Sequence, residues 1–168
     1  MDITSAAVND GVLDERFGCN GQDFAPGDMP SRSFPLEIVG APAGTASFAV
    51  IFDDPDSVPV CGFKWVHWLV TGLKTPKLPE DASRESDDIV QGVNSWYGRD
   101  VFDINAASRY GGPYPPDKVH TYVITVLALD FVPVLRTGFT YEDLEKVTKG
   151  HVLAKATLKC KYPPKYSN

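Results

Sequence analysis

The pattern of apolar and polar positions along the chain predicts strands more often than helices. Four apolar or alternating runs are bounded by Gly, Pro or Asp, and they cover residues 47–53, 64–71, 120–129 and 152–162. The second run is apolar on both faces, as in a central strand, whereas the last alternates lysines with apolar residues. We therefore expect several strands, the last of them half-exposed with its lysines outward.

One helix is predicted after the third strand. Thr140 can cap its first turn, with Asp143 three residues later in the capping-box position. Leu144 and Val147 form an apolar stripe, and Gly150 ends the helix.

The remaining pattern predicts long loops. The chain between Pro76 and Pro116 is mostly polar and rich in Gly, and the whole sequence holds 14 Gly and 14 Pro. A loop region of this length in a compact domain usually carries function. With 168 residues and no repeat or charged linker, the chain is expected to form one domain over residues 1–168. Its predicted class is mostly β, a β-sandwich with long loops and one short helix in the C-terminal half.

Charge and composition narrow the function classes. The net charge is −6 and no run of Lys or Arg is interleaved with aromatic residues, which argues against a nucleic-acid partner. No apolar stretch is long enough for a transmembrane segment, and residues 1–5 do not resemble a signal peptide. Cys19, Cys61 and Cys160 are odd in number and widely spaced, as expected of reduced thiols. The expected location is cytoplasmic.

The segment Asp54-Pro55-Asp56 is the first candidate for chemistry because it directly follows a predicted strand. In an extended backbone residues i and i+2 face the same way, so both carboxylates would point to one side. A plain turn is the alternative, since Asp and Pro are common turn residues.

The histidines provide further candidates. His120 and Tyr122 repeat the i, i+2 spacing at the start of a strand, and His67 lies inside an apolar strand. A buried histidine is more often a hydrogen-bonded core residue than a ligand residue, so both interpretations stay open for His67. His151 follows the helix-ending Gly150 and is interpreted as structural.

A glycine- and proline-rich loop, YGGPYPP, leads into His120. Its Gly-Gly pair allows close backbone approach and could aim N–H groups at an anion. A stiff surface loop is an equally good interpretation of this segment alone.

In order along the chain, the motifs FDDPDSVP, WVHWLV and YGGPYPPDKVHTY resemble those of the phosphatidylethanolamine-binding protein family, and more closely its bacterial and archaeal, Raf kinase inhibitor-like branch. The flanking segments FGCNGQDFAP, GAPAGTASFAVIFDDPD, QGVNSWYGR and GHVLAKATL agree with it. The resemblance covers roughly residues 17–162.

This resemblance implies a Greek-key β-sandwich with a small helix. It also implies a pocket that binds a small anion, namely phosphate, a phosphoethanolamine-like group or acetate. By motif position the implied ligand-binding residues are Asp54, Asp56, His67, Gly112, Tyr114, Pro115, His120 and Tyr122.

Three departures from the family pattern concern the pocket rim and any partner surface. Thr121 replaces an arginine, Gly72 replaces an asparagine, and Asp117-Lys118 stands in a shortened segment before His120.

The function expected from sequence is therefore non-enzymatic anion binding without a cofactor, with regulation of a kinase, protease or other protein partner as a possible role. The alternative is a hydrolase that uses Asp/His pairs as acid and base, although no GxSxG motif supports a nucleophile. A metal site built from two histidines and an Asp ranks third, because the residue types suit zinc or iron but the spacing gives no support. If an imidazole charges on binding, phosphate should bind more tightly below about pH 6.5.

Overall fold

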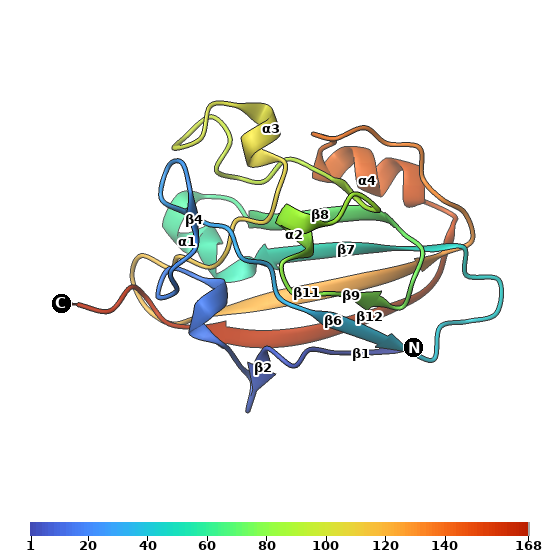
Figure 1. Ribbon diagram of the computed structural model, residues 1–168, viewed down its shortest axis with the longest axis horizontal. Helices are drawn as coiled ribbons and strands as arrows, with labels where there is room; N and C mark the ends of the chain where they lie inside the picture. Colours follow the sequence, from blue (N-terminus) through green and yellow to red (C-terminus); the bar gives the residue numbers. More distant parts are fainter. Residues whose placement is uncertain (168) are drawn as a thin grey trace.

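Two facing sheets build the fold (Figure 1), and the computed structural model describes residues 1–167. The larger sheet has seven strands, in the spatial order β10 (Val90–Gln91), β8 (Trp65–Leu73), β7 (Ser47–Asp54), β11 (His120–Leu129), β12 (Val152–Tyr162), β3 (Val12–Leu13) and β2 (Val8–Asn9). The smaller sheet has three strands, β1 (Asp2–Thr4), β6 (Leu36–Val39) and β9 (Lys77–Leu78). A further pair joins β4 (Phe24–Ala25) to β5 (Met29–Pro30).

The four long strands predicted from the sequence are adjacent members of the larger sheet. The chain runs through β7, turns back as β8, and returns after a long connection to place β11 on the free side of β7. All of these pairings are antiparallel, with Ile124 of β11 opposite Phe52 of β7 on one side and Leu158 of β12 on the other. The predicted mostly-β class and Greek-key β-sandwich are confirmed.

The main core lies between the two sheets. Ile38 of the smaller sheet packs in one cluster with buried residues of the larger sheet such as Phe52 and Trp68. The ring of Phe34 meets those of Phe52, Trp68 and Tyr110 edge-on, at centroid distances of 5.0, 5.8 and 5.7 Å. This aromatic cluster packs against β7 and β8, the two strands that carry Phe52 and Trp68.

Strand β12 shows the alternation that the sequence predicts. Ala156 and Cys160 are buried, whereas Lys155, Lys159 and Lys161 are exposed. Lysines on the outer face leave one side of the sheet solvated, as expected for a half-exposed strand.

The predicted helix is α4 (Tyr141–Thr148), and its capping box is present: Thr140 and Asp143 exchange side chain-to-backbone hydrogen bonds. Leu144 packs with Ile51 and Phe139 in a second cluster, so α4 covers the part of the outer face of the larger sheet that β7 and β8 form (Figure 1). The other helices are short, namely α1 (Val58–Cys61), α2 (Ala82–Glu85), α3 (Ile104–Ala107) and the 3-10 turns η1 (Glu15–Phe17) and η2 (Pro55–Ser57).

Over residues 1–167, no helix is long and apolar enough to cross a membrane.

Candidate functional site

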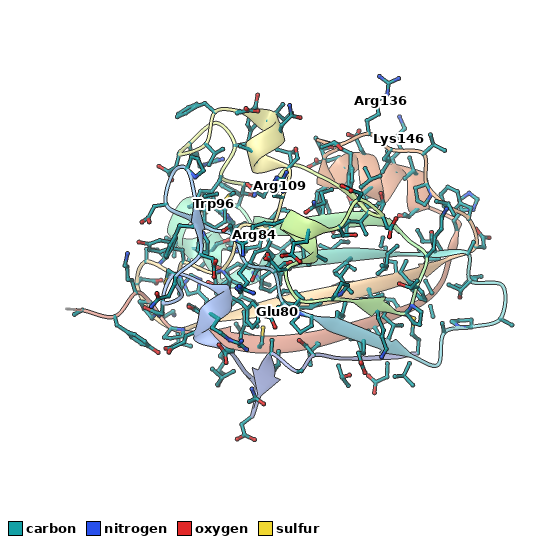
Figure 2. The ribbon with its side chains drawn as sticks, in the orientation of Figure 1. Glu80, Arg84, Trp96, Arg109, Arg136 and Lys146 are labelled. Atoms are coloured by element: carbon teal, nitrogen blue, oxygen red, sulfur yellow. The ribbon has the colours of Figure 1, made fainter. Side chains whose placement is uncertain are left out.

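A cavity of about 390 Å³ lies where three neighbouring strands meet the loops at one end of the larger sheet. Because the strands are antiparallel, the end of β7 lies beside the beginnings of β8 and β11. Trp96, which lines this cavity, is labelled in Figure 2 at the end of the molecule that carries α1 and β4. The lining residues are Gly27, Asp28, Asp54, Ser57, Val60, Cys61, Trp65, His67, Trp96, Asp100, Tyr114, Pro116, His120 and Tyr122.

Asp54 is brought to the cavity by the two-residue period of β7. Its neighbour Asp53 points to the opposite face and pairs with Lys64, with an Oδ2–Nζ distance of 2.9 Å. Asp54 accepts a hydrogen bond from Nδ1 of His120 at 2.6 Å and one from the backbone N–H of Asp56 at 2.9 Å. Burial raises the pKa of Asp54, and the contact with His120 only partly opposes this effect.

Asp56 does not lie beside Asp54 in the cavity wall. The prediction of a shared face assumed an extended backbone, and it is wrong because the chain turns into η2 at Pro55. The Asp56 carboxylate instead accepts a hydrogen bond from the backbone N–H of Thr121 at 2.8 Å. Asp56 therefore ties η2 to β11 and lies outside the cavity lining.

His120 is held between two carboxylates. Its Nδ1 lies 2.6 Å from Asp54 Oδ2, and its Nε2 lies 2.7 Å from Asp117 Oδ1. Burial by itself would lower the pKa of His120, but hydrogen bonds to the two carboxylates outweigh burial and raise the pKa. Since carboxylates accept hydrogen bonds, both contacts favour the imidazolium form of the ring, which can donate from both nitrogens.

His67, in contrast, is neutral at pH 7. Its Nδ1 donates to the carbonyl oxygen of Gly111 at 2.6 Å, and the rings of Trp96 and Tyr122 meet it edge-on. Burial lowers the pKa of His67 to about 4, so the ring is neutral at pH 7. With the proton on Nδ1, the Nε2 lone pair is left to accept a hydrogen bond from a group in the cavity.

Two buried donors at the cavity have no partner within residues 1–167. They are the hydroxyl of Tyr122 and the Nε1 of Trp65. Burial raises the pKa of Tyr122 strongly, so its hydroxyl stays protonated and can donate. Buried polar groups without partners are uncommon in folded proteins, and these two share one cavity.

Trp65 was missed by the sequence reasoning although a signal was present. It lies two residues before His67 on β8, and the same i, i+2 rule that joined His120 to Tyr122 applies to this pair. Its backbone N–H donates to Ser57 Oγ at 2.8 Å, which fixes the strand start against η2.

The glycine-rich loop does not aim its N–H groups at the cavity. The N–H of Gly111 donates to the carbonyl of His67 and that of Gly112 to the carbonyl of Pro30, both at 2.9 Å. A Cβ at Gly112 would collide with the carbonyl oxygen of Phe17, so this glycine is required by packing. Gly112 therefore lies outside the cavity lining, and the anion cradle expected from the Gly-Gly pair is not formed.

The end of this loop does reach the site. Tyr114 lines the cavity, as the family pattern implies, and its hydroxyl donates to Asp28 Oδ2 at 3.1 Å. Pro115 is buried outside the lining, and Pro116 contributes instead.

Asp28 and Asp100 add negative charge to the cavity wall, and sequence reasoning missed both. They lie just beyond the flanking segments FGCNGQDFAP and QGVNSWYGR, and no local pattern distinguishes them from surface aspartates. Over residues 1–167, no group of three or more His, Cys, Asp or Glu side chains is arranged to hold a metal ion.

The fold and the cavity define a β-sandwich protein whose pocket lies between strand ends and loops. The family model described as phosphatidylethanolamine-binding protein matches residues 3–163. The chain belongs to the phosphatidylethanolamine-binding protein family.

Individual relatives agree with this assignment. The protein YxkA of Bacillus subtilis is 37% identical over 150 residues, covering 86% of this chain and 85% of YxkA. Among solved structures, a phosphatidylethanolamine-binding protein homologue from Chlamydia trachomatis, CT736, has a TM-score of 0.77 and 30% identity, covering 96% of this chain and 95% of CT736. YbcL of Escherichia coli, described as a member of the mammalian family, also has a TM-score of 0.77, with 25% identity and coverage of 99% and 98% of the two chains.

Proposed function

We propose that the cavity binds a small anionic group, with phosphate or a phosphoethanolamine-like head group as its preferred chemistry. The observation that carries this proposal is the pair of buried, unpartnered donors, Tyr122 O–H and Trp65 Nε1–H. Both would gain a partner from an anionic oxygen, and leaving them unpaired costs about 1–3 kcal/mol each.

The charges of the wall favour a ligand with two charged ends. An anionic group beside Tyr122 and Trp65 would share the cavity with the ring of His120, whose charged form is favoured by its contacts with Asp54 and Asp117. An ammonium group would be stabilised by Asp28 and Asp100. Phosphoethanolamine should therefore bind more tightly than inorganic phosphate, and acetate should bind most weakly because it has fewer oxygens for the available donors.

Binding without catalysis is the preferred proposal. His120 has carboxylates on both ring nitrogens, so it offers no free lone pair to act as a base. A hydrolase is the second candidate, because the neutral His67 keeps an Nε2 lone pair that could accept a proton from water.

Calorimetry at pH 7 with phosphate, phosphoethanolamine and acetate tests the proposal. Saturable binding to the wild type, weakened in Trp65→Phe, supports it, and absence of binding for all three ligands contradicts it. A panel of phosphate and carboxylate esters tests the alternative: turnover by the wild type that is lost in His67→Asn would make the protein a hydrolase.

Regulation of a protein partner rests on the family relationship alone, and the cytoplasmic location stays a prediction from the sequence. Affinity purification with the wild type and with Tyr122→Phe as baits would test for a protein partner. Cell fractionation would test the location.

A further inference from the structure

The carboxylate of Asp117 occupies the outer nitrogen of His120. Asp117 Oδ1 lies 2.7 Å from Nε2, while Asp54 holds Nδ1 on the inner side. The two carboxylates differ in setting: the Asp54 side chain is 5% exposed, whereas that of Asp117 is 45% exposed. The inner contact is therefore built into the fold, and the outer contact is made from the surface.

Asp117 belongs to an exposed segment that borders the cavity. Residues 116–119 are all exposed, and Pro116 lines the cavity itself. Backbone at an exposed loop can rearrange at lower free energy than the buried strand that carries His120. The Asp117 side chain can thus leave Nε2 while Asp54 keeps the ring in place.

The Asp117 contact is chemically the one that an anionic ligand would make. A carboxylate oxygen accepts from an imidazolium N–H with the same geometry as a phosphate oxygen. With Asp117 in place, both N–H groups of His120 are used, and an incoming anion finds a second negative charge at the same nitrogen.

We propose that Asp117 is a tethered competitor for the anion site, which a ligand must displace from His120 Nε2 before it binds fully. This inference rests on the proposed function and adds a specificity residue to it. A tethered carboxylate that closes the site reduces the apparent affinity to the intrinsic affinity multiplied by the fraction of molecules in which the carboxylate has left Nε2. A monoanion such as acetate only exchanges one carboxylate for another, whereas a phosphate has further oxygens that could accept from the unpartnered donors of Tyr122 and Trp65.

Calorimetry with inorganic phosphate at pH 7 tests the proposal in Asp117→Asn and Asp117→Ala. Both variants should bind phosphate about 2- to 5-fold more tightly than the wild type, since ion pairs with an exposed partner change equilibria by a factor of a few. Asp130→Asn is the matched control, because Asp130 also contacts a histidine, His151, at 2.8 Å through an exposed carboxylate. That control lies at the opposite end of β11 and should leave the affinity unchanged.

A second measurement separates displacement from a general effect of charge. In wild-type protein titrated with phosphate, the NMR signals of the Asp117 carboxyl carbon and of the amides of residues 117–119 should shift with the same Kd as calorimetry. Equal or weaker affinity in both Asp117 variants, while the wild type binds, would overturn this inference alone. If neither the wild type nor Asp117→Ala binds phosphate or phosphoethanolamine, the inference and the proposed function both fail.

Discussion

His67 Nδ1 lies 2.6 Å from the carbonyl oxygen of Gly111, and this hydrogen bond joins β8 to the loop that precedes β11. The carbonyl can only accept, so the Nδ1 proton is fixed and the Nε2 of a neutral ring is the free nitrogen. The same wall contains His120, whose contacts with two carboxylates favour the charged form of the ring. The pKa values of the two histidines are thus shifted in opposite directions, which favours the neutral ring at His67 and the charged ring at His120.

The burial of neutral His67 should make stability depend on pH. Its folded pKa of about 4 lies below the ordinary value of 6.5, so the unfolded chain takes up a proton first as the pH falls. The contribution of His67 to the free energy of unfolding should decrease between pH 6.5 and pH 4, by about 3 kcal/mol in total. Denaturant unfolding of the wild type and of His67→Asn over this range measures the change as a difference between the two proteins. A difference that is independent of pH would show that His67 is not buried in the neutral form.

His120 should show the opposite sign. Its folded pKa is raised, because the hydrogen bonds to Asp54 and Asp117 outweigh burial. Its stabilising contribution should be complete below pH 6.5 and should be lost as the pH rises through the folded pKa. NMR titration of the ring should find the imidazolium still present above pH 6.5. The stability difference between the wild type and His120→Gln should shrink at high pH, and a ring that titrates below 6.5 would contradict the two-carboxylate arrangement.

The same low pKa affects ligand binding. An anion at Nε2 of His67 favours the charged ring, so binding of phosphate should take up a proton. Phosphate affinity in the wild type should increase as the pH falls from 7 to 5, and His67→Asn should remove the part of this change that His67 causes. Calorimetry in buffers of different ionisation enthalpy counts the protons taken up. Equal proton uptake in the two proteins would exclude His67 as the group that charges.

Substitutions at two buried tyrosines should separate effects on ligand binding from effects on stability. The Tyr122 hydroxyl has no partner within residues 1–167, whereas the Tyr110 hydroxyl donates to the carbonyl of Phe17 at 2.8 Å. Tyr122→Phe should leave stability unchanged or slightly higher and weaken phosphate binding about tenfold. Tyr110→Phe should cost about 1–3 kcal/mol of stability and keep the affinity, because Tyr110 does not line the cavity. Thermal unfolding and calorimetry measure both effects, and a reversed pattern would remove Tyr122 from the site.

Gly112 should be essential for packing. Gly112→Ala forces a Cβ against the carbonyl oxygen of Phe17, and backbone atoms there have little freedom to move. The expected loss is about 3 kcal/mol or more. Gly150→Ala is the control, since a Cβ there meets nothing within 4 Å and only the positive φ of 82° is unfavourable, at about 1 kcal/mol. Equal melting temperatures for the two variants would contradict the packing role.

The sequence was sufficient to predict the strands and the helix that depend on the pattern of neighbouring residues. Strands β7, β8, β11 and β12 follow from apolar runs bounded by turn residues, and α4 follows from the capping box at Thr140. These elements depend on periodicity and on local hydrogen bonds, which the order of residues specifies directly. The i, i+2 rule held for His120 and Tyr122 because β11 is extended there. It failed for Asp54 and Asp56 because η2 begins at Pro55.

The family motifs pointed to Tyr114, which lines the cavity, and equally to Gly112 and Pro115, which do not line it. A motif identifies the segment that forms a site and not which atoms of the segment face the ligand. The sequence shows that Gly112 has a backbone N–H group, but only the fold shows that this group donates to the carbonyl of Pro30.

By itself, then, the sequence determined the strands, the late helix, the family and the segments from which the cavity is built. Only the tertiary structure decided which side chains share that cavity and in what charge state. Asp28, Trp96 and Asp100 reach it from distant segments, and Asp117 reaches His120 through a loop whose path no local pattern specifies. The pKa values of His67 and His120 differ because one ring is buried against aromatic rings and the other between carboxylates. Burial and partner geometry are properties of the folded chain, so the chemistry of the site depends on contacts between residues far apart in sequence.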